Sequence, residues 1–409
     1  MNILLINHYA GSVEHGMEYR PFYMAREWKK LGHKTLITAA SFSHVRSKQP
    51  EFKKKIFYES IKGINYLWLK TPSYNGNGVG RIFNMFSFIS MLFKQGQAIA
   101  REFKPKAVIA SSTYPLDIFP AFYISKLSKA KLIFEVHDLW PLSPKELGGY
   151  SKYHPFIQIM QIAEDFAYKH ADKIVSILPK TKEYMISRGL DPLKFNYIPN
   201  GVLIENETKH LPDDIQKILK NLKNNGKFLV CYAGSHGLAN ALEYFIDAAY
   251  LLKDENVAFI LVGRGPAKES LKQKAYSLKN VFFFDTIHKL SMPDLLSFMD
   301  ALYIGLKKET LFRFGISPNK LMDYMLAGKP VIHAIDAGND IVKESGCGIS
   351  IEPENPNAVY SAVKNLMALD KNSLEIMGNK GKEFILKNHS YSILSAQFLD
   401  VIKGISIEN

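Results

Sequence analysis

The chain has 409 residues, of which 47% are hydrophobic and 22% charged, a globular composition that excludes a disordered protein. Its only cysteines, Cys231 and Cys347, exclude a disulfide framework and a cysteine-based zinc site, and they fit a reducing cytoplasm. The net charge of +13 comes entirely from residues 1–203, which hold 28 Lys and Arg against 15 Asp and Glu, whereas residues 204–409 hold 24 of each. Either the first half faces something anionic, such as lipid head groups, a pyrophosphate or nucleic acid, or the charge only keeps the chain soluble.

In the first half, short apolar runs alternate with segments long enough for crossover helices. Residues 2–7 have no basic region before them and predict a first buried strand rather than a signal peptide. A helix follows whose apolar face includes Phe22, Ala25 and Trp28. Further strands are predicted at residues 34–38, 107–110, 131–135 and 173–176. This alternation predicts a parallel sheet covered on both faces.

Residues 81–103 predict a helix with eight large apolar side chains between Phe83 and Phe93. Basic residues flank this stretch, namely Arg81, Lys94, Arg101 and Lys104. The segment fits an interfacial helix on an anionic membrane, and it fits equally a helix buried under the first sheet. No apolar run reaches 18 residues, so we expect no membrane-spanning helix.

The pattern restarts near Phe228 and predicts a second α/β domain. Its strands are expected at residues 228–234, 258–263, 281–286, 301–306 and 329–334. The break follows residues 197–202, so we predict a hinge near 199–205. The sequence therefore predicts two Rossmann-like, doubly wound domains, residues 1–203 and 204–389, facing each other across a cleft, with a helix at about 390–409 packing back on the first domain.

The loop after the first strand contains Gly11 and Gly16, which would let the backbone approach a ligand at a helix N-terminus. It is not a G-x-G-x-x-G element, so a nicotinamide dinucleotide site is set aside. Four polar side chains are expected where an acceptor or a donor phosphate would be contacted: His8, His15, Glu18 and Arg20. The alternative is a plain connecting loop.

His137 and Asp138 lie at the predicted carboxyl end of a strand, where α/β sheets place ligand-contacting groups. We expect His137 to hydrogen-bond a sugar hydroxyl and Asp138 to orient His137. A surface pair of a histidine and an acid is the alternative.

The second domain carries two similar loops. Gly234, Ser235 and His236 follow its first strand and predict a phosphate-facing loop. Arg264 lies between two glycines after the next strand, where it would cap or stack on a base.

Residues 315–331 predict a turn and a helix that together bind a nucleotide. Lys320 would neutralise a phosphate, and Asp323, expected early in the helix, would accept hydrogen bonds from the hydroxyls of a ribose. An acid near a helix N-terminus is also stabilised without any ligand. That alternative does not explain the residues that lead into the helix, Ser317, Pro318, Asn319 and Lys320.

Taken together, the stretches EVHDLWP, IPNGV, YAGSHG, VGRGP and SPNKLMDYMLAGKPV resemble glycosyltransferase family 4, the retaining transferases of the GT-B fold, over nearly the whole chain. Within the family the chain is similar to bacterial O-antigen and capsule transferases of amino sugars, of the N-acetylfucosamine type. The resemblance implies a hexosyltransferase of lipopolysaccharide or capsule synthesis. Such an enzyme moves an N-acetylated amino or deoxyamino sugar from a UDP-sugar to a polyprenyl-pyrophosphate-linked saccharide.

The resemblance also implies that the anomeric configuration is retained and that no cofactor and no metal take part. The first domain would bind the acceptor and the second the donor. Lys320 would contact the diphosphate, Asp323 the ribose and His137 the donor sugar. The protein would be cytoplasmic and peripheral to the anionic inner face of the cytoplasmic membrane.

The chain departs from the family pattern of two glutamates eight positions apart. The second falls on Asp323, but the first falls on Gly315, so its role is expected to pass to backbone amides around residues 316–319. The arginine and lysine that often hold the diphosphate are not evident after YAGSHG, and Arg264 and Lys320 are expected to replace them.

Three other functions stay open. An epimerase or hydrolase of the same fold would turn over the nucleotide sugar without an acceptor. A catalytically silent binder would hold the diphosphate without turnover, because the carboxylate at Gly315 is missing. A nucleic-acid binder would use the positive charge, but the sequence has no RNP-like or zinc-finger motif.

Overall fold

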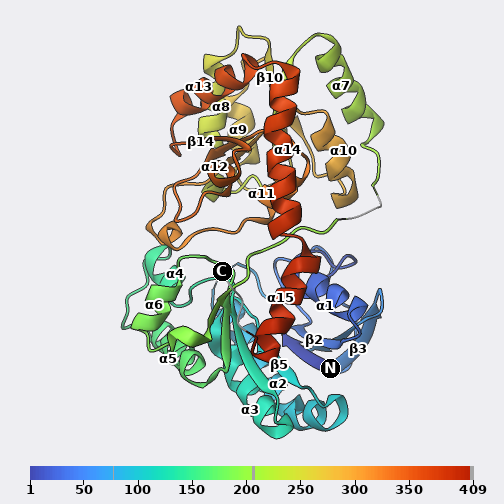
Figure 1. Cartoon of the computed structure of the whole chain (residues 1–409), viewed down its shortest axis with the longest axis vertical. Helices are drawn as coiled ribbons and strands as arrows, with labels where there is room; N and C mark the ends of the chain where they lie inside the picture. Colours follow the sequence, from blue (N-terminus) through green and yellow to red (C-terminus); the bar gives the residue numbers. More distant parts are fainter. Residues whose placement is uncertain (77, 205–207, 406–409) are drawn as a thin grey trace. The chain divides into compact units, whose positions relative to one another are not determined.

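The computed structural model describes residues 1–76, 78–204 and 208–405, and the chain forms two compact units. The first unit comprises Met1–Asn200 and the C-terminal residues from Tyr391 onward, and the second comprises Gly201–Ser390 (Figure 1). The expected hinge at 199–205 and the expected C-terminal helix at 390–409 extend into residues 205–207 and 406–409, which lie outside the described residues.

The first unit is built on an eight-stranded sheet in the order β3-β4-β2-β1-β5-β6-β7-β8. Its strands are β1 Asn2–Ile6, β2 Lys34–Ala40, β3 Ile56–Ile61, β4 Ile64–Leu69, β5 Ala107–Ala110, β6 Lys131–Val136, β7 Lys173–Ser176 and β8 Phe195–Tyr197. All neighbours pair in parallel except β3 and β4. The predicted strands are parallel, as expected, and the antiparallel β3 is an addition at the edge that was not predicted from the sequence. A turn at Lys62 and Gly63, both with positive φ, allows the tight hairpin.

Several helices of the first unit pack in two groups. Their bounds are α1 Arg20–Lys30, α2 Val79–Ala98, α3 Ile118–Ser128, α4 Leu142–Glu146, α5 Pro155–His170, α6 Lys182–Ser187 and α15 Tyr391–Lys403. One group contains α2, α3 and α5, and the other contains α1 and α15. The buried indole of Trp28 on α1 donates to the carbonyl of Ser395 at 3.0 Å, which fixes α15 beside α1 (Figure 1).

Helix α2 has one buried face and one exposed apolar face, so it has features of both structures that residues 81–103 allow, a buried helix and an interfacial helix. Met85, Phe88 and Leu92 are buried against the unit, whereas Phe83 is 67% exposed. Exposed apolar residues recur at helical spacing on one face of α2, namely Val79, Phe83, Phe86 and Phe93. A π-helical turn, Ile99–Phe103, ends the segment.

The second unit is built on a six-stranded parallel sheet in the order β11-β10-β9-β12-β13-β14. Its strands are β9 Phe228–Ala233, β10 Val257–Val262, β11 Val281–Phe284, β12 Ala301–Gly305, β13 Val331–Ala334 and β14 Gly348–Ile351. Its helices are α7 Asp213–Asn224, α8 Leu242–Leu251, α9 Lys268–Lys274, α10 Met292–Ser297, α11 Asn319–Leu326, α12 Ile341–Ser345, α13 Pro356–Met367 and α14 Lys371–Asn388.

Alternate residues of β9 enter two separate cores. Leu229 and Cys231 join the core that includes Leu321 of α11, and Val230 and Tyr232 join the core that includes Phe245 of α8. Because side chains alternate across a strand, both faces of this sheet are buried, as its continuous apolar strands require. The prediction of two Rossmann-like α/β domains is confirmed. Among the described residues, the helices are too short or too polar for any of them to cross a bilayer.

Candidate active site

The first unit contains a polar cavity of about 320 Å³ near the carboxyl ends of its central strands. Three of the residues predicted for the site line it: Glu18, His137 and Asp138. Further polar residues complete the wall, including Asn7, Tyr9, His44, Arg81 and Asn200.

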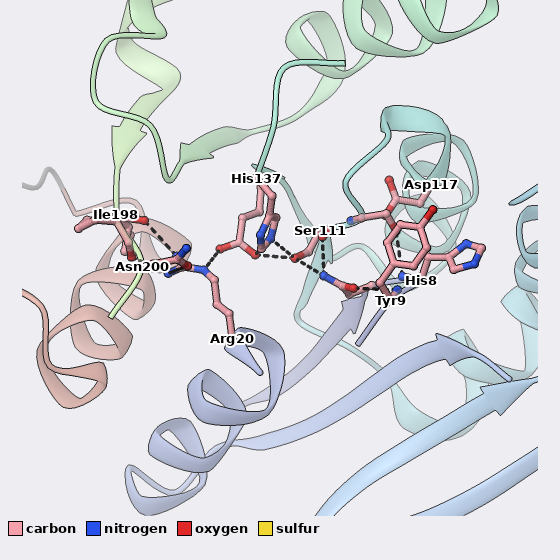
Figure 2. Close-up of polar contacts among 12 residues, drawn as sticks. His8, Tyr9, Arg20, Ser111, Asp117, His137, Ile198 and Asn200 are labelled. Carbon is pink, nitrogen blue, oxygen red and sulfur yellow. Dashed lines mark hydrogen bonds and ion pairs between the residues drawn. The ribbon is translucent and has the colours of Figure 1, made fainter. Parts of the chain in front are cut away.

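A buried ion pair lies beside His137. Arg20, at the start of α1, donates from Nε to Glu135 Oε1 at 2.9 Å, and its other guanidinium nitrogens bond the carbonyls of Ile198 and Pro199 at 3.0 and 2.5 Å. Figure 2 shows Arg20 reaching toward Ile198 and Asn200. The prediction that Arg20 contacts a phosphate is wrong, because this guanidinium is 1% exposed and holds the first unit together.

Glu135 is the group that orients His137. Its Oε2 lies 3.2 Å from His137 Nε2 and accepts a hydrogen bond from Ser111 Oγ at 2.6 Å (Figure 2). Burial alone would raise the pKa of Glu135, but the charge of Arg20 and the hydrogen bonds from His137 and Ser111 outweigh it and hold that pKa well below its usual range. Glu135 is therefore an ionised, buried carboxylate.

Asp138 does not orient His137, contrary to the prediction. Its carboxylate accepts hydrogen bonds from the Leu139 backbone at 2.8 Å, from the Trp140 indole at 3.1 Å and from the Ser143 hydroxyl. Burial raises the pKa of Asp138, although these bonds oppose the shift. The carboxylate thus organises the turn into α4 at the edge of the cavity.

The first glycine loop closes on itself rather than on open space. A side chain at Gly11 would meet the carbonyl oxygen of Gly16 at 1.9 Å, and one at Gly16, whose φ is +92°, would meet Ser47 Oγ at 2.5 Å. His15 is buried in the same loop with its Nδ1 on Ser12 Oγ at 3.0 Å, so it is not presented to a phosphate as predicted. Among the residues predicted from this loop, Glu18 is the one that reaches the cavity.

His8 is also enclosed, and the prediction of a phosphate contact does not fit it. Its Nδ1 contacts the Tyr114 hydroxyl, and burial together with the nearby charge of Arg46 holds the pKa of His8 well below its ordinary value. The imidazole is therefore neutral at physiological pH and acts as a core residue.

The second unit places Lys320 at its first glycine loop. Lys320 Nζ donates to the Tyr232 hydroxyl at 2.5 Å and to Asn240 Oδ1 at 3.3 Å, and it lies 4.0 Å from the centre of the Tyr232 ring. Gly234 has a φ of +155°, and a side chain there would meet Lys320 Cε at 2.6 Å. The glycine therefore leaves the space that Lys320 occupies.

Helix α11 is anchored so that Lys320 reaches this loop. The Tyr324 hydroxyl accepts from the Ala233 amide at 2.7 Å and donates to the Ala233 carbonyl at 3.1 Å, at the end of β9. Lys320 lies four positions before Tyr324 and so projects from the same face of the helix. Burial of the ammonium group lowers the pKa of Lys320 to about 7.

The two candidate residues of the glycine loops differ in exposure, since His236 is buried and Arg264 is exposed. His236 is 0% exposed, and neither ring nitrogen has a hydrogen-bond partner in the described part of the chain. Burial, aided by Lys268 and Lys320, lowers the pKa of His236 to about 4. The ring is enclosed rather than presented to a ligand as predicted, whereas Arg264 and Ser235 are exposed.

Backbone packing explains the second glycine loop. A side chain at Gly263 would meet the carbonyl oxygen of Gly234 at 1.9 Å, and one at Gly265 would meet the backbone of His236 at 2.5 Å. Both glycines are therefore explained by the close approach of this loop to the first glycine loop of the same unit.

The turn into α11 differs from the prediction in two respects. The helix begins at Asn319, after Ser317 and Pro318, so Asp323 lies beyond its first turn and gains little from the helix dipole. The Ile316 amide donates to Asn339 Oδ1 at 2.7 Å and is therefore already occupied. It cannot take the role of the carboxylate that Gly315 lacks.

Sequence reasoning missed Glu135, Ser111, Tyr232 and Lys268. A local signal existed for Glu135, because residues two apart along a strand share a face and His137 follows it at that spacing. Lys268 gave no such signal: its Nζ bonds the Gly263 carbonyl at 2.9 Å and Asp285 at 2.6 Å, contacts that depend on strand order.

Two family models match the chain: Glycosyltransferase Family 4 over residues 15–206, and Glycosyl transferases group 1 over residues 227–368. WbjE of Pseudomonas aeruginosa, whose name assigns it to the glycosyltransferases, is 24% identical over 83% of this chain and 84% of that protein. WcaI of Escherichia coli (strain K12), named for glycosyl transfer in colanic acid biosynthesis, is 24% identical over 69% of this chain and 70% of that protein.

The crystal structure of Anabaena HepE in complex with UDP-glucose superimposes on 99% of this chain and 100% of its own, with a TM-score of 0.68 and 16% identity. Fold and family matches together define this chain as a glycosyltransferase with the GT-B fold. The two family matches and the two relatives support a glycosyltransferase of the family 4 type.

Proposed function

We propose that the chain transfers an N-acetylated amino or deoxyamino sugar, with retention, from a UDP-sugar to a polyprenyl-pyrophosphate-linked saccharide in the synthesis of a bacterial surface polysaccharide. Lys320 carries this proposal. It is a partly buried cation at a glycine loop whose hydrogen-bond partners, Tyr232 and Asn240, are both neutral. A diphosphate would supply the missing negative charge.

Two of the similar proteins support a UDP-sugar donor and a polysaccharide product. HepE was crystallised with UDP-glucose, and the name of WcaI assigns it to colanic acid biosynthesis. In the proposed reaction Lys320 stabilises the departing UDP by its charge, so that the enzyme needs no metal. The departing phosphate helps to take the proton of the acceptor hydroxyl.

The test is release of UDP from a panel of UDP-hexosamines, with and without a lipid-pyrophosphate-linked saccharide, in the presence of EDTA. Release that needs one donor and the acceptor is expected. Release without an acceptor would instead indicate an epimerase or hydrolase. UDP binding without release on any panel member would indicate a silent binder, consistent with Gly315 and with the occupied Ile316 amide.

We also propose that the first unit docks on the anionic inner face of the cytoplasmic membrane through α2. The exposed residues Val79, Phe83, Phe86 and Phe93 form an apolar stripe along one face of this helix, and Lys94 lies exposed beside them. An apolar stripe with basic neighbours suits a surface of anionic lipid.

Vesicles with and without phosphatidylglycerol test the docking surface. The double variant F83S/F86S is expected to lose about tenfold or more in affinity for anionic vesicles. The control is L193S, which removes an apolar side chain that is 82% exposed outside α2. Equal binding by both variants would contradict the proposal.

A further inference from the structure

His137 is held at one ring nitrogen and open at the other. Its Nε2 lies 2.9 Å from Ser111 Oγ and 3.2 Å from Glu135 Oε2. Its Nδ1 has no hydrogen-bond partner among the described residues. This nitrogen is not fully buried either, so a ligand can reach it. Since His137 lines the cavity, Nδ1 is the ring nitrogen that a ligand there can reach.

The hydrogen-bond pattern around Nε2 decides which nitrogen carries the proton. Ser111 has a single hydroxyl proton, and it is donated to Glu135 Oε2 at 2.6 Å. An ionised carboxylate can only accept. Both neighbours of Nε2 are therefore acceptors, so Nε2 must donate, and the neutral imidazole keeps its lone pair on Nδ1.

The surrounding contacts fix this arrangement. Arg20 binds Glu135 Oε1 at 2.9 Å, which leaves Oε2 to face Ser111 and His137. Asn7 donates to the Ser111 carbonyl at 2.6 Å and also approaches Ser111 Oγ at 3.3 Å, so this hydroxyl has a further donor and no second proton to give. Asp138 is engaged with the turn that follows and does not compete for the ring.

We propose that Glu135, together with Arg20 and Ser111, is the positioning residue that holds His137 as the Nε2–H tautomer, so that Nδ1 accepts a hydrogen bond from a sugar hydroxyl in the cavity. A position bearing hydrogen or fluorine instead of hydroxyl cannot make this bond. The identification of the ligand as a sugar rests on the proposed glycosyl transfer. The hydroxyl belongs either to the donated sugar or to the acceptor saccharide.

The tautomer is measured directly by NMR of the full-length protein labelled with ¹⁵N in its histidine rings. Loss of one signal set in H137Q assigns His137. At mildly alkaline pH the expected result is a proton on Nε2 and none on Nδ1. A protonated Nδ1, or a near-equal mixture of the tautomers, would overturn the inference.

Glu135→Gln should reverse the tautomer. Because Arg20 can only donate, the carbonyl oxygen of the new amide must face Arg20, and its NH₂ group then replaces Oε2 and donates to His137 Nε2. The proton is expected to move to Nδ1. The control is S143A, which removes a hydroxyl that binds Asp138 and should leave the tautomer unchanged. If E135Q does not fold, the wild-type spectrum alone still decides.

Kinetics with deoxy analogues locate the hydroxyl. In the wild type, one deoxy position is expected to raise KM about tenfold, and H137Q should be insensitive to the same change. A response confined to donor analogues assigns the bond to the donated sugar, and one confined to acceptor analogues assigns it to the acceptor. Equal sensitivity of wild type and H137Q at every position would overturn the inference. If NMR shows the expected tautomer but no sugar is transferred, the proposed function is refuted and the hydrogen-bond arrangement around His137 still stands.

Discussion

Arg20 in the first unit and Lys320 in the second are two cations withdrawn from water, and they differ in what faces them. Arg20 is paired with the carboxylate of Glu135 at 2.9 Å and also binds three oxygens in residues 198–200, directly after β8. Within the described part of the chain, the hydrogen-bond partners of Lys320 are neutral, and its pKa is lowered to about 7. A buried cation with its own carboxylate serves the fold, whereas one that lacks a counter-charge is suited to a ligand that brings one.

The comparison extends to the histidines of the two sites. His137 is bound at Nε2 by Ser111 and Glu135 and reaches a cavity. His236 is enclosed, and neither of its ring nitrogens has a partner within the described ranges. In the first unit the side chain that can bind a ligand is therefore His137, and in the second unit it is Lys320.

The largest expected effect comes from breaking the paired cation. Arg20→Met leaves Glu135 buried without its partner, and should lower the free energy of unfolding of the first unit by about 3–5 kcal/mol. All three tryptophans, Trp28, Trp68 and Trp140, lie in this unit, so tryptophan fluorescence during urea unfolding reports on it.

Arg26→Met is the matched control on the same helix. Arg26 is 30% exposed and pairs with Glu27 at 3.3 Å, so its loss should cost at most about 1 kcal/mol. Equal destabilisation by the two variants would show that the buried pair of Arg20 and Glu135 contributes no more to the free energy of unfolding than an exposed pair does.

Removing the unpaired cation should damage binding rather than stability. Lys320→Met is expected to weaken UDP binding by about 100-fold or more, because the charge facing the diphosphate is lost. Its free energy of unfolding should not fall, since a desolvated charge is removed. Calorimetric titration with UDP and urea unfolding measure the two quantities.

K279M serves as the control, because Lys279 is an exposed lysine of the same unit. It should leave UDP binding unchanged. If K320M bound UDP as tightly as K279M does, Lys320 would not be the diphosphate contact.

Gly234→Ala should displace Lys320 without removing its charge. The new methyl group would lie 2.6 Å from Lys320 Cε at a backbone φ of +155°, so the lysine must move. We expect UDP affinity to fall about tenfold or more. Gly237→Ala in the same loop, where φ is −86° and the nearest atom is 3.3 Å away, should have a much smaller effect. Equal losses would mean that the loop, not the lysine, determines affinity.

The pH dependence should be the mildest effect, and its sign is opposite for binding and for stability. With a pKa of about 7, Lys320 loses its proton above neutrality in the free protein, so affinity for a UDP-sugar should fall by up to about tenfold per pH unit above that point. Binding should then take up protons. Between about pH 7 and the ordinary lysine value of 10.5 the unfolded chain holds more protons, so this group makes the unliganded fold more stable as pH rises.

The groups around Lys320 should not mask this effect. His236, with a pKa of about 4, is already neutral, and burial raises the pKa of Tyr232 far above the range of the test. Lys268 stays paired with Asp285. Titrations of K320M should lose the pH dependence, and if they retained it another group would be responsible.

The sequence by itself determined the two α/β units and the position of their loops. Alternating and continuous apolar runs are local patterns, and the strands at 107–110 and 173–176 lie where they were predicted. Similar local reasoning placed His137 at the carboxyl end of a strand, where it lines the cavity. Lys320 was predicted instead from the turn that leads into its helix. The hairpin of β3 and β4 was missed because its strands lie at an edge and half of β3 is exposed.

Only the tertiary structure decided which side chains meet. Arg20 and Glu135 are separated by 115 positions and Lys320 and Tyr232 by 88, so no local pattern could pair them. The order of strands brought β6 near the start of α1 and the end of β9 beside α11. That order is fixed by burying both faces of each sheet, a property of the whole unit. The tertiary structure therefore distinguished the lysine that lacks a counter-charge from the arginine that has one.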